Sequence, residues 1–374
     1  VKARYPESLT EDQAVSQAYS LEDVTNVELI DATDGADGAD QPGDDGGNSS
    51  IGNYWDQWYL DYLGITDAWG YARCEGSVSV AVLNSGVWAT PDLRANLDMD
   101  NAWDAVTNSS LASDPIHPHG TWVAGVIAAE AGDNRGVSGV SYNAKVVPVN
   151  IVDKVEADSA GNLLAKTSDR ILANAITHVV DEHETNHVRV INISYGKLGK
   201  AAGCLQTAIN YATESNISVV CSAGNNNTDE LYTPSDLDNV ISVIATTTNE
   251  RWVDPADQSV GSGYGSAKDI AAPGYNVKTV AANPDSYGIA YCIGTSFSAP
   301  IVSGVLALMY AANPNLTAAD AESYLENTAT DLGEPGFDNE FANGLVNAKA
   351  AVLSVASEDA LFTRLAGDYA VNTM

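Results

Sequence analysis

The sequence Gly294-Thr295-Ser296-Phe297-Ser298-Ala299-Pro300 begins a long apolar segment of helical period that extends to Ala312. A serine in the first turn of a helix lies beside backbone N–H groups that have no partner within the helix. These groups orient the hydroxyl and favour negative charge that develops near it. The segment therefore predicts a nucleophile, Ser296, although a serine here can also be only a helix N-cap.

Short Val/Ile-rich segments before this helix predict strands that are covered on both faces, at residues 77–83, 145–151, 188–194, 217–222 and 240–245. Apolar residues at helical spacing predict helices at 168–185, 204–215, 296–312 and 317–328. This alternation predicts an α/β fold with a mostly parallel central sheet and helices on both faces. Ligand sites in such sheets lie at the carboxyl ends of the strands.

Polar residues stand where that rule predicts a site. Asn84 follows the first predicted strand, Ser194-Tyr195-Gly196 closes the third and Ala223-Gly224-Asn225 closes the fourth. His119 and Ser296 each open a helix, so both lie at a positive helix end. Right-handed connections between the strands would bring all of these residues to one crevice.

Together these segments resemble the blocks of the subtilisin-like serine proteases. They occur in the family's order as Asn84-Ser85-Gly86, His119-Gly120-Thr121, Ser194-Tyr195-Gly196, Ala223-Gly224-Asn225 and Gly294 to Pro300. The resemblance covers about residues 54 to 353, and it implies a subtilisin-like fold and a serine endopeptidase that forms an acyl-enzyme.

The resemblance also assigns roles to individual residues. It implies that Ser296 is the nucleophile, that His119 is the general base and that Asn225 stabilises the oxyanion together with the backbone N–H of Ser296. The substrate-binding residues that it implies are Ser194, Tyr195, Gly196, Ala223 and Gly224. His117, between two prolines, is expected to lie in a loop.

Asn84 stands where the family has the aspartate of its catalytic triad. An amide is nearly isosteric with a carboxylate, so the fold should be retained. However, an amide can donate to the histidine and select the wrong tautomer, and it offers no charge to an imidazolium. The same exchange in a trypsin-type enzyme lowers kcat by about 10⁴. The acidic residues further along, Asp92, Asp98 and Asp100, do not follow a strand end, so we do not expect them to substitute.

Two explanations of Asn84 stay open. The chain can be an active protease whose aspartate was changed so that a precursor stays uncleaved, or a naturally weakened member that serves as a peptide-binding module. The other catalytic positions are intact, which favours the protease. An α/β-hydrolase esterase is disfavoured, because the order here is Asn84, His119, Ser296 and the serine lacks the G-x-S-x-G elbow.

The composition divides the chain into four parts. Residues 1–30 are expected to be the remnant of a pro-segment or another N-terminal extension, which could be a partner of the catalytic domain. Residues 31–53 read as an acidic linker rich in Gly and Asp. Residues 54–353 form the catalytic domain, and residues 354–374 a C-terminal tail. Because the chain begins at Val1 without a signal-peptide pattern, we expect a processed or trimmed fragment.

The charge excludes several partners. Fifty acidic and 17 basic residues give a net charge of -33, which repels nucleic acids and anionic lipid surfaces. The acidic surface fits either solubility outside a cell or high salt. We expect a protein that is secreted or at the cell surface, has no membrane span and takes polypeptides as substrates.

Cysteines and metal ligands give weaker signals. Cys204 and Cys221 could form a disulfide or be two small buried side chains. His178, His183 and His187 lack a closing carboxylate motif, so a solvated face is favoured over a metal site. The catalytic chemistry implies no cofactor. Structural calcium is common in the resembling family, but residues 158–162 are better read as a hairpin turn than as a ligand set.

Overall fold

A computed structural model describes residues 57–110, 115, 117–132, 135–157 and 163–356. The predicted pro-segment, the linker and nearly all of the C-terminal tail lie outside the described residues. Residues 158–162, the acidic turn considered for calcium, also lie outside them. The strands on either side of that turn, β5 (Lys154–Ala157) and β6 (Leu163–Lys166), form an antiparallel pair.

The core of the fold is an eight-stranded sheet in the order β12-β11-β9-β7-β1-β4-β2-β3. Neighbouring strands are parallel except for β2 and β3. Their bounds are β1 (Ser79–Asn84), β2 (Trp103–Asp104), β3 (Ser109–Ser110), β4 (Lys145–Asn150), β7 (Val188–Ile193), β9 (Ser218–Ser222), β11 (Ile241–Thr246) and β12 (Ile270–Pro273). The α/β fold and all five strands predicted from Val/Ile-rich segments are confirmed, within two residues at each end.

The strand order changes direction at β1. From β1 the chain adds β4 on one side, and then β7, β9, β11 and β12 in succession on the other. Val80 of β1 is in register with Val146 on one neighbour and Val190 on the other. Such a point opens a crevice at the carboxyl ends of the strands, which is where β1 ends at Asn84.

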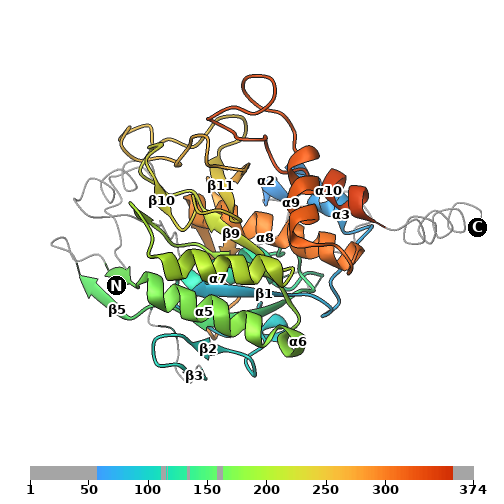
Figure 1. Ribbon diagram of the computed structural model, residues 1–374. Coiled ribbons are helices and arrows are strands. Elements are labelled where there is room, and N and C mark those ends of the chain that lie inside the picture. The colour runs from blue at the N-terminus through green and yellow to red at the C-terminus, as the bar shows by residue number, and fades with distance from the viewer. Residues whose placement is uncertain (1–56, 111–114, 116, 133–134, 158–162, 357–374) are drawn as a thin grey trace, which may run out of the picture.

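Helices cover both faces of this sheet. On one face lie α5 (Asp169–Asp181) and α7 (Gly203–Glu214), which cross in front of the sheet in Figure 1. On the other face lie α4 (His119–Ala128) and α8 (Thr295–Ala312). Successive residues of β1 alternate between the two layers, so Val80 packs with α4 and α8 while Ala81 packs with α5 and α7. Both faces are therefore apolar, as the sequence predicted.

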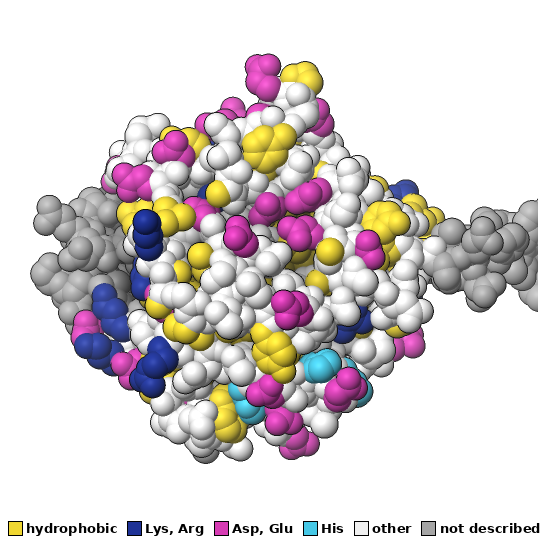
Figure 2. All heavy atoms as spheres, in the orientation of Figure 1, with side chains coloured by type: hydrophobic (Ala, Val, Ile, Leu, Met, Phe, Trp, Pro, Cys, Tyr) yellow, Lys and Arg dark blue, Asp and Glu magenta, His cyan; other side chains and the backbone are white. Residues whose placement is uncertain are grey.

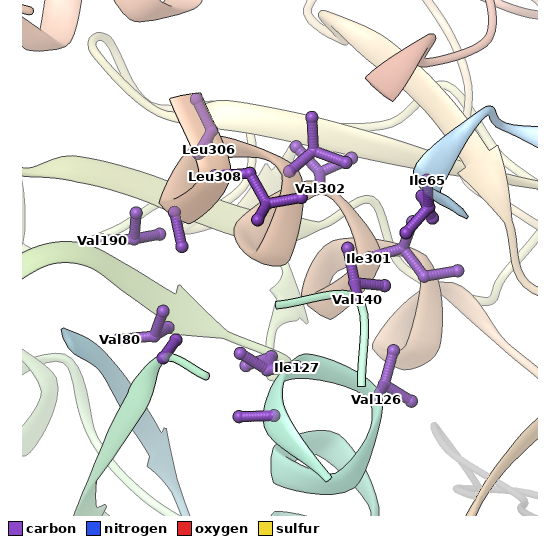
Figure 3. Packing of buried hydrophobic residues seen from close by; sticks show 14 of the residues in the cluster. Ile65, Val80, Val126, Ile127, Val140, Val190, Ile301, Val302, Leu306 and Leu308 are labelled. Atoms are coloured by element: carbon purple, nitrogen blue, oxygen red, sulfur yellow. The ribbon is translucent and has the colours of Figure 1, made fainter. Parts of the chain in front are cut away.

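The helix that carries Ser296 runs through the protein interior. α8 has 18 residues with a mean hydropathy of 1.4, and 89% of it is buried. By length and composition it could cross a membrane, whereas no such segment was expected from the sequence. It is the one helix of this kind in the described part of the chain. In Figure 3, Ile301 of α8 and Val126 of α4 lie close to Val140, and all three belong to one buried cluster. Because its partners are protein side chains, α8 is the central core helix.

The remaining elements surround these layers. The helices are α2 (Trp58–Tyr62), α3 (Ile65–Ala68), α6 (His183–Asn186), α9 (Ala318–Asn327) and α10 (Ala348–Val355), with a 3₁₀ turn at Arg94–Asn96. Two further antiparallel pairs join β8 (Lys197–Leu198) to β10 (Tyr232–Thr233), and β13 (Val277–Val280) to β14 (Ile289–Cys292). In Figure 2 acidic side chains are spread over the visible face, while lysines and arginines gather at one side.

The cysteines remain free thiols. The disulfide considered from the sequence is absent, so that alternative is wrong. The other alternative, two small buried side chains, is right for Cys221 in β9 but wrong for Cys204, which is exposed at the start of α7. Two of the histidines for which a metal site was disfavoured, His178 and His183, contact other groups of the protein. His178 stacks on Trp103 with ring centroids 3.9 Å apart, and the Nδ1 atom of His183 lies 2.6 Å from the carbonyl oxygen of Val180.

Candidate active site

The first residues of α4 lie directly against the end of β1. A Cβ atom on Gly120 would lie 2.1 Å from the carbonyl oxygen of Gly86 and 3.2 Å from the Cβ atom of Asn84. Only glycine therefore permits this approach. The contact places His119, the first residue of α4, beside Asn84; both side chains are buried.

Asn84 and His119 form the hydrogen bond that the triad requires. The Oδ1 atom of Asn84 lies 2.8 Å from Nδ1 of His119. The same oxygen accepts the backbone N–H of Ser85 at 2.9 Å. A backbone N–H can only donate, so it holds the amide oxygen, and not the amide nitrogen, on this side. His119 then carries its proton on Nδ1, and its Nε2 can accept a proton from a serine.

This orientation of the Asn84 amide differs from the one considered in the sequence analysis, in which the amide nitrogen donates to the histidine. An amide that donated to His119 would select the inactive tautomer, but Ser85 holds the amide oxygen toward the ring. What Asn84 lacks is the negative charge that would stabilise an imidazolium. The site thus holds a neutral acceptor at the Nδ1 atom of His119.

Ser85 has a second role that the sequence did not reveal. Its hydroxyl donates to the carbonyl oxygen of His117 at 2.8 Å and accepts the N–H of Gly120 at 3.2 Å. It thus ties the end of β1 to both sides of His119. The Asn84-Ser85-Gly86 motif contained this signal, since a small hydroxyl residue at a strand end commonly bonds nearby backbone. His117 lies in the loop before α4, as predicted.

Ser296 lies in the first turn of α8, after Gly294. Gly294 has a φ of 127°, in the region that favours glycine, and Ser296 is 1% exposed. In a regular helix the carbonyl of Ser296 would accept the N–H of residue 300, but Pro300 has none. The hydroxyl of Ser194 donates to this carbonyl at 2.8 Å instead. Ser194, which follows β7, therefore anchors the turn that carries Ser296.

We expect Ser194→Ala to destabilise the protein by about 1–3 kcal/mol, because a buried carbonyl would lose this donor. Urea unfolding measures the change. Ser266→Ala, at an exposed serine, is the matched control and should change the free energy of unfolding by less than about 0.5 kcal/mol. Equal effects of the two substitutions would contradict the anchoring role.

Asn225 lies beside the same helix start. Its Oδ1 atom accepts the backbone N–H of Thr295 at 3.0 Å and the Thr295 hydroxyl at 2.8 Å. These donors fix the amide oxygen toward α8 and turn the Nδ2 group toward Gly294, where an added Cβ would lie 3.2 Å away. The side-chain N–H of Asn225 is thus held beside the start of the helix that carries Ser296. A fixed N–H donor of this kind can stabilise an oxyanion.

The predicted substrate-binding residues line the ends of two neighbouring strands. Residues 194–196 connect β7 to β8, and residues 223–225 follow β9. Tyr195 is partly buried against the core of α5 and α7, and burial raises the pKa of its hydroxyl. Ser194 and Asn225 both contact the first turn of α8, so the structure brings the two segments to Ser296.

The acidic residues considered as substitutes for the triad aspartate are engaged elsewhere. Oδ2 of Asp92 accepts the N–H of Val137 at 2.9 Å, and a Cβ atom on Gly136 would overlap this carboxylate. Asp98 accepts the side chain of Asn101 at 2.7 Å. Asp100 is exposed. The residue that contacts the Nδ1 atom of His119 is thus Asn84.

Among the described residues, one group of acidic side chains is close enough to hold a metal ion: Asp269, Glu322 and Glu326. It joins α9 to the amino end of β12, whereas Asn84, Ser194 and Asn225 lie at carboxyl ends of the parallel sheet. Burial raises the pKa of Asp269 to about 7, and burial together with Glu322 raises the pKa of Glu326 to about 7. These groups bear on stability rather than on the chemistry at Ser296.

We expect Glu326→Gln to raise the melting temperature at pH 8 and to leave it nearly unchanged at pH 4. A carboxyl whose pKa is raised in the folded state stabilises the protein below its ordinary pKa near 4, and this stability is lost as the pH rises through about 7. Differential scanning fluorimetry at the two pH values measures the change. Glu334→Gln, at an exposed site, is the control. An equal shift at both pH values would contradict the prediction.

The chain is similar to known proteins in sequence. A model of the subtilase family matches residues 75–344. The chain is 34% identical to an extracellular protease of Xanthomonas campestris over 78% of its own length, but spans only 53% of that relative. It is 31% identical to subtilisin BL of Lederbergia lenta, with 76% of this chain and 97% of the relative covered.

The chain is also similar to solved structures. Fervidolysin from Fervidobacterium pennivorans superposes with a TM-score of 0.66 at 30% identity, over 79% of this chain and 45% of that one. A protease of Pseudoalteromonas arctica gives a TM-score of 0.68 at 29% identity, over 82% of this chain and 99% of that one. The sheet, the buried helix that carries Ser296 and the matched family model lead to one conclusion: this chain belongs to the subtilase family.

Proposed function

We propose that the protein is a serine endopeptidase with reduced turnover. The observation that carries the proposal is the hydrogen bond between Nδ1 of His119 and Oδ1 of Asn84, with the amide oxygen held by the N–H of Ser85. This bond leaves Nε2 of His119 as a proton acceptor, which a nucleophilic serine requires.

In the proposed reaction, His119 takes the proton of Ser296 as its Oγ atom attacks the peptide carbonyl. The side-chain N–H of Asn225 and the backbone N–H of Ser296 stabilise the negative oxygen that forms. His119 then gives its proton to the leaving amine, and an acyl-enzyme remains on Ser296. A water molecule, activated by His119 in the same way, releases the acyl product.

The reduced turnover follows from the positive charge that His119 carries after it takes the proton of Ser296. When His119 is protonated, a carboxylate would stabilise it by a charge-assisted hydrogen bond of about 1.5–3 kcal/mol, whereas a neutral bond contributes about 1 kcal/mol. Asn84 supplies only the neutral bond. Chemistry therefore proceeds in the proposal, but over a higher barrier.

The relatives support an extracellular role. The Xanthomonas protein is described as an extracellular protease, and the net charge of -33 favours solubility outside a cell. We propose that this protein is likewise secreted and acts on polypeptides. Its own N-terminal segment, residues 1–30, is proposed as a further partner of the catalytic domain.

Labelling with a fluorophosphonate tests the proposed nucleophile in the chain as it stands. The reagent should attach to Ser296, as located by mass spectrometry of the digested protein, and a His119→Ala variant should react far more slowly. Peptide binding without labelling, even after Asn84→Asp, would favour the peptide-binding module instead and would overturn the proposal.

A further inference from the structure

The side chain of Tyr232 fills the space between the two proposed substrate-binding segments. A Cβ atom on Gly196 would lie 2.2 Å from Cε1 of Tyr232, and one on Gly224 would lie 2.7 Å from Cε2. The aromatic ring therefore lies against the α-carbons of both glycines, with one edge toward each. Tyr232 is only 5% exposed, so the protein surrounds the ring on its other sides.

This position is held by the backbone on both sides of the ring. Tyr232 belongs to β10, which pairs with β8 immediately after Gly196. Its N–H donates to Oδ2 of Asp236 at 2.8 Å, and its carbonyl accepts the N–H of Asp236 at 2.9 Å. Burial raises the pKa of the hydroxyl, so the side chain stays neutral. The ring is thus a fixed part of the site, and a substrate cannot displace it without breaking this pairing.

The reaction geometry determines which substrate group meets the ring. The carbonyl carbon of the scissile bond must lie at the Oγ atom of Ser296, with its oxygen toward Asn225. The residue that carries this carbonyl then lies between residues 194–196 and residues 223–225, because Ser194 and Asn225 contact the first turn of α8 from these two segments. Its side chain points into the gap between Gly196 and Gly224. Tyr232 occupies that gap.

We propose that Tyr232 determines the specificity of the enzyme and restricts the residue on the acyl side of the scissile bond to glycine, alanine or serine. This inference rests on the proposed function. A larger side chain would have to overlap a buried ring, and packed interiors accommodate extra volume poorly. Discrimination by a pocket reaches about 10- to 200-fold for a single methylene, so alanine should be preferred to phenylalanine by at least about 100-fold.

The test uses peptide p-nitroanilides that differ only in the residue before the scissile bond, which is alanine, leucine or phenylalanine. The full chain with Asn84→Asp provides measurable rates, and kcat/KM is compared among the substrates. This chain should prefer alanine to phenylalanine by at least about 100-fold. Adding Tyr232→Ala should shift that ratio toward phenylalanine by about 100-fold, whereas Tyr232→Phe, which keeps the ring, should leave it within a few fold.

The outcomes separate the inference from the proposed function. Equal cleavage after alanine and phenylalanine by the Asn84→Asp chain overturns the role of Tyr232 and leaves the protease activity intact. That comparison uses the chain with Tyr232 in place, so it tests the inference even if the Tyr232→Ala variant does not fold. Equal ratios for Tyr232→Ala and Tyr232→Phe, in variants that label at Ser296, also overturn it. No cleavage of any substrate and no labelling overturn both proposals.

Discussion

Replacing Asn84 by aspartate should raise kcat for peptide hydrolysis by about 10-fold. The carboxylate would accept the Nδ1–H of His119 as the amide oxygen does now, and would add a negative charge beside the imidazolium. The difference between a charge-assisted bond of about 1.5–3 kcal/mol and a neutral bond of about 1 kcal/mol is about 0.5–2 kcal/mol, which corresponds to about 2- to 30-fold in rate. The larger value of about 10⁴ known from a trypsin-type enzyme includes the wrong tautomer, which the N–H of Ser85 prevents here.

The neighbouring strand offers a matched control. Asn150 ends β4 and is in register with Asn84 across the parallel pair. Asn150→Asp adds the same charge at the same edge of the sheet without contacting His119, so kcat should change by less than about threefold. Steady-state rates on one peptide substrate compare the three proteins. A gain near 10⁴ for Asn84→Asp would show that the amide nitrogen faces His119. Equal gains for Asn84→Asp and Asn150→Asp would show that the added negative charge, and not its hydrogen bond to His119, raises kcat.

The sequence predicted the fold well because its signals are local. Each Val/Ile-rich segment forms a strand whose neighbours bury it on both faces, so composition alone identifies it. The positions of Asn84, Ser194 and Asn225 followed from the rule that sites lie at the carboxyl ends of parallel strands. The sequence also predicted the helix α8, but not that it is long and apolar enough to pass for a membrane span. Its apolar character comes from burial on all sides rather than on one face.

Two features of the site could not be predicted from the sequence because they depend on contacts between distant segments. The orientation of the Asn84 amide depends on a backbone N–H, which every residue except proline has and which no motif reveals. Tyr232 meets Gly196 only because β10 pairs with β8, across more than 30 residues of chain. Its own neighbours in the sequence show no pattern typical of a binding site.

Removing the nucleophile should have the largest effect, and its size should depend on residue 84. The members of a triad act as a unit, so loss of the serine costs about as much as loss of all three, roughly 10⁶ in kcat. We therefore expect Ser296→Ala to lower kcat by about 10⁶ in the Asn84→Asp chain. In the chain with Asn84, which is expected to lack about 10-fold of that rate already, the same substitution should cost only about 10⁵.

This difference gives a second measure of the tautomer that does not depend on the first. Were the amide to hold His119 in the inactive tautomer, the chain with Asn84 would already have lost about 10⁴, and Ser296→Ala would cost only about 10² more. Single-turnover cleavage with enzyme in excess measures these slow rates in all four proteins. An equal loss in both backgrounds would mean that Asn84 and Ser296 act independently, which the hydrogen bond from Asn84 to His119 argues against.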